Sequence, residues 1–153
     1  MSKPQYKETI NTSAEKVYNT MLGLKNIKTY EAWTAVFNPT STYEGSWNKG
    51  EKILFLGTDK DGNRAGMVSE IAENIQNKFV SIRHVGILDK GVEITSGEGV
   101  ANLANCFENY HFEEENGKTT LMVEITGFEE HQEYFNSTYP KALAKLKEIT
   151  ESE

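Results

Sequence analysis

The clearest alternation of apolar and polar residues lies on either side of Asn116-Gly117. Asn-Gly favours a two-residue type I′ hairpin turn, because both central residues of that turn need a positive φ. Residues that face each other across such a hairpin share one face of the sheet. The pairing predicts an inner face made of Cys106, Glu108, Tyr110, Phe112, Leu121, Val123 and Ile125. A carboxylate and a phenol on an otherwise apolar face predict a lined cavity rather than a plain core.

Apolar residues at helical spacing predict three helices. Thr12-Ser-Ala-Glu15 is typical of a capping box, in which Thr12 begins a helix that Gly23 ends. A second short helix is expected over residues 25–36, and a long terminal helix over residues 130–151. Pro140 lies within the terminal helix, where a proline should kink the helix or mark a restart.

The rest of the chain reads mainly as strands, over residues 4–10, 40–45, 52–58, 65–72 and 79–87, together with the two strands of the hairpin. Asp61-Gly62, taken as a two-residue turn, pairs Leu56 with Met67. The next turn, near residues 74–77, then puts Met67, Ile82 and His84 on one internal face.

The same pairing sets Phe55, Val68 and Val85 on the alternate face, which is therefore also apolar. Residues 88–105 break the strand pattern, since they combine three glycines with several polar residues. A connection of this length inside a compact domain is usually functional, so this segment is a candidate lid.

The order of elements predicts an α+β fold in a single domain, residues 1–153. An antiparallel sheet with one apolar face must bury that face, and the terminal helix is the only expected element long enough to cover it. A curved sheet around one helix leaves space between them, which is a physical route to an internal pocket.

Four segments carry a resemblance to a known superfamily: residues 10–17, residues 43–50, Glu108-Asn-Tyr110 with the hairpin at 116–121, and residues 139–147. Their order resembles the helix-grip superfamily, the START-like or SRPBCC proteins. More narrowly, it resembles the branch similar to the C-terminal domain of the heat-shock-protein-90 ATPase activator (AHSA-like).

The resemblance implies a curved antiparallel sheet of about six or seven strands wrapped around a long C-terminal helix, with two short helices after the first strand. It also implies a deep hydrophobic cavity for lipids, polyketides, or flavonoid-like or hormone-like molecules. A minority of the superfamily are enzymes, and the protein that gives the branch its name binds a chaperone.

Charge and residue counts limit the classes of partner, location and cofactor that are expected. The formal charge of −7 argues against nucleic acid and against anionic membrane surfaces, both of which need clustered Lys and Arg. The single cysteine, Cys106, forms no intrachain disulfide and suits a cytoplasmic location. The three histidines and the cysteine lack metal-site spacing, and no phosphate-binding glycine loop is present, so no metal or other cofactor is expected.

The candidate ligand-binding residues are Tyr30, Trp33, Met67, His84, Glu108 and Tyr110. Binding sites favour aromatic side chains with a few polar groups, which here would orient a small apolar ligand. Ordinary core packing is the alternative for each aromatic residue, and a structural hydrogen bond is the alternative for His84 and Glu108. Two other functions stay open: a chaperone-associated interaction module, for which the apolar alternate face is the only support in the sequence, and a cyclase- or hydrolase-like enzyme using Glu108 and His84.

Overall fold

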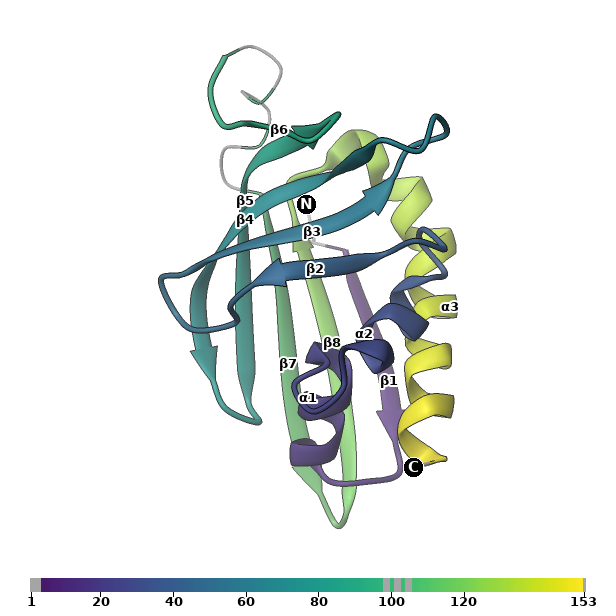
Figure 1. Ribbon diagram of the computed structural model, residues 1–153. Coiled ribbons are helices and arrows are strands. Elements are labelled where there is room, and N and C mark those ends of the chain that lie inside the picture. Colours follow the sequence, from purple (N-terminus) through teal and green to yellow (C-terminus); the bar gives the residue numbers. More distant parts are fainter. Residues whose placement is uncertain (1–3, 98–99, 101–102, 104–105, 153) are drawn as a thin grey trace.

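The computed structural model describes residues 4–97, 100, 103 and 106–152. Its elements are β1 (Gln5–Ile10), α1 (Ala14–Leu22), α2 (Ile27–Thr34), β2 (Thr42–Gly45), β3 (Lys52–Thr58), β4 (Arg64–Ile75), β5 (Phe79–Asp89), β6 (Val92–Ile94), β7 (Phe107–Glu115), β8 (Lys118–Thr126), a 3₁₀ turn (Glu129–His131) and α3 (Gln132–Glu151). Figure 1 shows the strands as one curved sheet, with α3 running alongside β1 and the two short helices near one end.

The predicted α+β helix-grip architecture is confirmed. Eight antiparallel strands of the described residues form one sheet. Seven follow the order β1-β8-β7-β5-β4-β3-β2, and the eighth, β6, pairs with the C-terminal end of β5 at residues 87–89. The expected count of six or seven strands was too low, because β6 lies in the segment expected to be a loop. Residues 88–94 are thus part of the sheet rather than a lid, while residues 98–99, 101–102 and 104–105 of the candidate lid lie outside the described residues.

The hairpin prediction is confirmed in its register. Asn116 and Gly117 have φ values of 54° and 78°, and β7 pairs with β8 so that Glu108 faces Ile125 and Tyr110 faces Val123. The apolar residues of the predicted inner face are all buried. Because the conformation of the turn depends on Asn116 and Gly117 themselves, these two residues were enough to predict the register of β7 and β8.

The β3–β4 register was wrong by one residue. Leu56 pairs with Gly66 and Phe55 with Met67, because residues 59–63 form a longer connection in which the Asp59 carboxylate accepts hydrogen bonds from the backbone of Asp61 and Asn63. A slip of one residue moves every side chain of a strand to the other face.

The corrected register removes the apolar outer face that was expected at Phe55, Val68 and Val85. Phe55 lies on the inner side, packed against Trp47 and Tyr30, and Val68 is buried. Val85 is half-buried beside a surface hollow. The sequence support for an exposed apolar contact surface at these three positions is therefore lost.

Each helix differs slightly from its prediction. Ser13, not Thr12, caps α1: its hydroxyl accepts from the Lys16 backbone, while the Thr12 carbonyl accepts from Thr119 on β8. Gly23 ends α1 in the left-handed conformation, as expected. α3 continues through Pro140 without a restart. Within the described part of the chain, no helix is long and apolar enough to cross a membrane.

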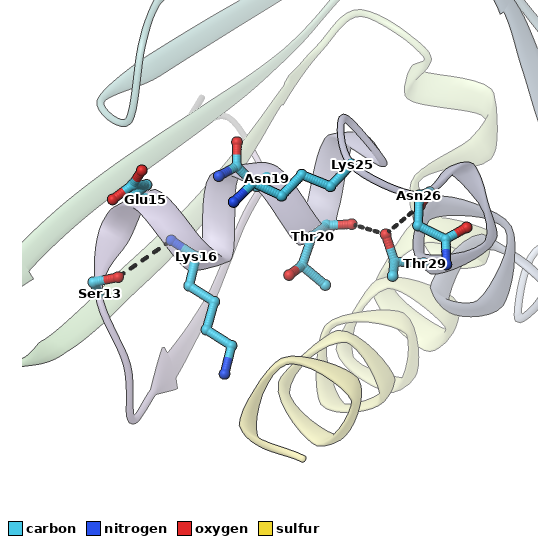
Figure 2. Close-up of a pocket in the computed structure, with 8 residues that line it drawn as sticks. All are labelled: Ser13, Glu15, Lys16, Asn19, Thr20, Lys25, Asn26 and Thr29. Atoms are coloured by element: carbon cyan, nitrogen blue, oxygen red, sulfur yellow. Dashed lines mark hydrogen bonds between the residues drawn. The ribbon is translucent and has the colours of Figure 1, made fainter. Parts of the chain in front are cut away.

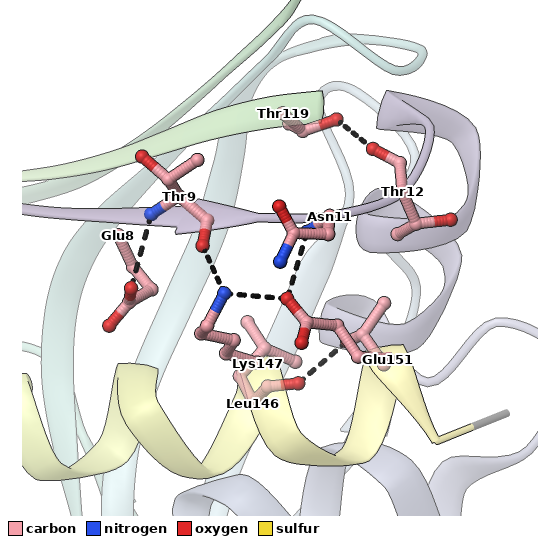
Figure 3. A network of polar contacts seen from close by, with 9 residues as sticks. Glu8, Thr9, Asn11, Thr12, Thr119, Leu146, Lys147 and Glu151 are labelled. Carbon is pink, nitrogen blue, oxygen red and sulfur yellow. Dashed lines mark hydrogen bonds and ion pairs between the residues drawn. The ribbon is translucent and has the colours of Figure 1, made fainter. Parts of the chain in front are cut away.

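Polar contacts fasten the C-terminal end of α3 to the end of β1 (Figure 3). The Lys147 ammonium donates to the Thr9 carbonyl at 2.7 Å and to the Glu151 carboxylate at 2.6 Å, and the Asn11 backbone donates to the same carboxylate. The preceding turns of α3 cover the core with a buried face made of Tyr139, Ala142, Leu143 and Leu146. The sheet and α3 are thus held in a fixed relation on either side of the interior.

Candidate functional site

A cavity of about 150 Å³ lies where α2, the sheet and α3 meet. All six residues predicted from the sequence line it: Tyr30 and Trp33 from α2, Met67 from β4, His84 from β5, and Glu108 and Tyr110 from β7. The structure brings these side chains to one place, and their role in holding a ligand stays a prediction.

Seven further lining residues were not predicted as site residues: Thr34, Phe37, Ser41, Phe55, Ile82, Phe135 and Tyr139. Several of them had a readable signal. Ile82 was expected on the internal face with Met67 and His84, and Phe135 and Tyr139 recur at helical spacing in the expected terminal helix. Phe37 follows Trp33 by four residues, the spacing that keeps side chains on one side of a helix. Phe55 was missed because the register error turned it outward.

Strand pairing places Glu108 beside His84. β5 and β7 are neighbours, and Ile82 faces Glu108 directly across the ladder. His84 lies two residues further along β5 on the same face, within reach of a long side chain on a diagonal. The His84 Nε2 and Glu108 Oε1 atoms are 2.8 Å apart. The proximity left open by the sequence is therefore a direct hydrogen bond.

Glu108 is the centre of a chain of polar contacts. On the sheet side, His84 links it to Ser69, whose hydroxyl lies 2.7 Å from His84 Nδ1. On the helix side, the Tyr139 hydroxyl donates to Glu108 Oε2, and Tyr110 is in turn a side-chain hydrogen-bond partner of Tyr139. Glu108 thus receives one hydrogen bond from each layer of the fold.

These contacts set the charge of the cavity. Burial alone raises the pKa of Glu108, but the hydrogen bond from His84, the attraction of a protonated imidazole when one forms, and the hydrogen bond from Tyr139 outweigh burial and hold that pKa below its usual value. Glu108 is therefore a carboxylate at neutral pH. Burial and then the Glu108 charge raise the pKa of Tyr30, Tyr110 and Tyr139, so these phenols stay neutral.

The hydrogen-bond partners of His84 show which ring nitrogen donates to Glu108. A carboxylate only accepts, so His84 Nε2 carries the hydrogen that points to Glu108. Ser69 is fully buried, and within the described residues its hydroxyl has no partner besides His84 Nδ1. The Ser69 hydroxyl can donate to Nδ1 or accept from it, and in either case it holds this side of the ring. His84 is 2% exposed and the Glu108 side chain 18%, so Glu108 is the member of the pair that is more open to the cavity.

The serine, histidine and glutamate do not form a nucleophilic triad. Ser69 contacts His84 Nδ1, the ring nitrogen that does not face Glu108, and it does not line the cavity, so its hydroxyl is not placed to attack a molecule there. In the arrangement seen here, Ser69 and Glu108 hold the two ring nitrogens and fix the imidazole. The site can therefore anchor a ligand at Glu108 more readily than it can carry out acyl transfer.

A larger hollow of about 450 Å³ lies on the surface between α1 and α2 (Figure 2). Three of its polar groups serve the helices themselves: Ser13 caps α1, Asn26 caps α2, and the Thr29 hydroxyl donates to the Thr20 carbonyl. No aromatic side chain lines this hollow. It is a solvated groove between helices, and the smaller interior cavity is the better candidate site.

Comparison with known proteins shows the fold alone. No model of a known protein family matches the chain, and no curated protein sequence matches it. Among solved structures, the Aha1 dimer from Colwellia psychrerythraea is 16% identical, with a TM-score of 0.66 over 99% of this chain and 97% of that one. Protein NE0264 from Nitrosomonas europaea is 14% identical, with a TM-score of 0.69 over 99% and 95%.

A third similar structure is DynU16, from the dynemicin biosynthetic locus. It is 11% identical, with a TM-score of 0.67 over 99% of this chain and 48% of DynU16. All three similarities support the helix-grip architecture, in which one antiparallel sheet packs against a C-terminal helix.

Proposed function

We propose that the protein binds a small, mostly apolar molecule in the interior cavity, with Glu108 as its polar anchor. The observation that carries the proposal is an ionised, four-fifths buried carboxylate facing a cavity whose other walls are largely aromatic. A buried charge is costly unless it is paired, and the described residues leave one unused lone pair on each Glu108 oxygen after the bonds from His84 and Tyr139. A ligand that donates a hydrogen bond would complete this coordination.

The cavity volume limits the ligand. A dry apolar cavity of about 150 Å³ holds one benzene-sized molecule, whereas drug-sized ligands occupy sites of roughly 300–1,000 Å³. The cavity of about 150 Å³ therefore accommodates a single ring, or one end of a lipid, polyketide or flavonoid-like molecule. A whole molecule of those classes requires the aromatic side chains to move apart.

An amide NMR titration tests binding. We expect benzyl alcohol to give saturable shifts at the amides of Trp33, Met67 and Tyr110. Longer ligands, such as a fatty acid, a flavonoid and a sterol, should bind only if they also shift the α2 and α3 amides as the cavity widens. A well-dispersed spectrum that responds to none of these probes would contradict the proposal and favour the partner-binding alternative.

A matched pair of variants locates the anchor. Glu108→Gln removes the negative charge inside the cavity, and Glu115→Gln removes one at an exposed position on the same strand. We expect only the first variant to change the affinity for a confirmed ligand. Equal affinities for the two variants would remove Glu108 from the site.

An enzymatic role is the second candidate, favoured by the 2.8 Å contact between His84 and Glu108. A general base works best with a pKa near the working pH. The pKa of Glu108 is instead lowered, which makes it a weak proton acceptor at neutral pH. The pair is thus better suited to holding a ligand than to moving its protons.

A further inference from the structure

Most hydrogen-bond donors of the described lining residues are used within the protein, whereas the Glu108 carboxylate offers acceptors. Trp33 donates its indole N–H to the Met21 carbonyl at 2.9 Å, and Thr34 donates its hydroxyl to the Tyr30 carbonyl at 2.7 Å. The His84 and Tyr139 donors both point at Glu108.

The remaining lining hydroxyls also have partners within the protein. The Tyr30 hydroxyl is a hydrogen-bond partner of Ser41, and the Tyr110 hydroxyl of Tyr139. The Tyr30 and Ser41 hydroxyls share one hydrogen bond, which leaves one hydroxyl hydrogen uncommitted among the described lining residues. An anion would find at most this one neutral donor, beside a carboxylate that repels it.

The charge of the cavity points the same way. Glu108 is ionised, and none of the described lining residues is a Lys or Arg. The His84 ring is 2% exposed and its nitrogens are taken up by Glu108 and Ser69. The charge that faces the cavity is thus the Glu108 carboxylate, in a low-dielectric interior where an opposite charge interacts far more strongly than in water.

The aromatic walls favour positive charge as well. Trp33 presents only its ring to the cavity, because its N–H is used elsewhere, and Tyr30, Phe37 and Phe55 add further ring surface. The face of an aromatic ring is the negative end of its quadrupole and attracts ammonium groups. A carboxylate among aromatic rings is chemically matched to an organic cation.

We propose that the cavity selects a small organic cation, namely a protonated amine on an apolar body of about one ring, with its ammonium group at Glu108. This inference rests on the proposed binding function and names the ligand class. An ammonium group has three N–H donors, which can use the free lone pairs on both Glu108 oxygens while the ring fills the apolar part of the cavity.

Three probes of similar size and different charge test the inference on the full chain at pH 8: benzylamine, benzyl alcohol and benzoate. We expect calorimetry to give an affinity for benzylamine at least tenfold above that for benzyl alcohol, with no binding of benzoate. Equal or tighter binding of the alcohol would overturn the cation preference and leave the binding function standing. Failure of all three probes to bind would overturn both.

The Glu108→Gln variant assigns the preference to one residue. In this variant we expect the affinity for benzyl alcohol to fall modestly and that for benzylamine to fall much further, to within about twofold of the affinity for the alcohol. Glu115→Gln should keep the full preference. A tenfold preference that survives in Glu108→Gln would refute Glu108 as its source. The comparison of the three probes needs no variant, so it decides the matter even if Glu108→Gln does not fold.

Discussion

Replacing His84 by Phe should reverse the effect of pH on stability. Phe keeps a ring of similar size, so the contacts of the His84 ring with Phe55 and Phe128 persist. The change removes both hydrogen bonds of the imidazole, one to Ser69 and one to Glu108. Glu108 keeps only the hydrogen bond from Tyr139, and the Ser69 hydroxyl is left without a partner in the interior.

The magnitude follows from those two losses. An unsatisfied buried hydroxyl costs about 1–3 kcal/mol, and a lost hydrogen bond to a charged group costs about 1.5–3 kcal/mol. We therefore expect His84→Phe to lower the free energy of unfolding by about 3–5 kcal/mol at pH 8.

The pH dependence distinguishes the mechanism from general core damage. In the wild type the pKa of Glu108 is lowered, so its contribution is present above the unfolded-state pKa and is lost as the pH falls through the folded value. In the variant, burial remains and most of what opposed it is gone, so the folded pKa rises above the unfolded one. The folded variant then gains stability relative to the wild type as the pH falls and Glu108 takes up a proton.

Urea unfolding at pH 8, 6.5 and 5 measures this. We expect the difference between His84→Phe and the wild type to shrink steadily towards pH 5. Ser69→Ala leaves His84 Nδ1 unpaired but keeps the hydrogen bond to Glu108, so it should cost about 1–3 kcal/mol with a weaker pH dependence than His84→Phe. His111→Phe, a matched change on the outer face, should cost less than about 0.5 kcal/mol. A penalty for His84→Phe that is the same at all three values of pH would refute the charge-based account.

Two further predictions concern the backbone and the tyrosines. Gly66→Ala should destabilise the protein by more than about 2 kcal/mol in urea unfolding, because its Cβ would lie 1.9 Å from the Phe55 carbonyl oxygen. Gly62→Ala, also at positive φ but in open space, should cost only about 1–2 kcal/mol, and equal effects would contradict the steric reasoning. The raised pKa values of Tyr110 and Tyr139 stabilise the fold below the phenol pKa of the unfolded chain, and this contribution is lost as the pH rises through the folded values. Absorbance at 295 nm and circular dichroism should therefore show these phenols ionising together with alkaline unfolding, and ionisation of all seven tyrosines with native dichroism would contradict their burial.

The two Gly-containing turns show what sequence can and cannot fix. At Asn116-Gly117 the two turn residues alone determine the register, so the inner face of β7 and β8 was predicted correctly. At Asp61-Gly62 the connection is longer, because the Asp59 side chain caps the turn and brings Asn63 into it. Side-chain capping of this kind has no fixed length signal, and the resulting slip of one residue turned Phe55 the wrong way.

Single site residues could be predicted from the pattern of one strand, but contacts between separate strands, or between the sheet and α3, could not. Glu108 and His84 stand out as polar residues on apolar faces, but their contact depends on β5 lying next to β7, although 17 or more residues separate these strands along the chain. Tyr139 was visible only as part of an apolar helix face. Its hydroxyl reaches Glu108 because α3 packs over the sheet, and that packing is a tertiary fact with no local signature.

Glu108 joins the two layers of the fold, since it accepts one hydrogen bond from the sheet and one from α3. Stability alone does not explain such an arrangement. Replacing a buried ionic cluster by well-packed apolar residues is often neutral or stabilising. An apolar core would therefore give the fold similar or greater stability. The cluster does keep a carboxylate ionised, oriented and still able to accept two more hydrogen bonds inside a cavity. That combination is what the proposed recognition of a ligand requires, and the core itself does not require it.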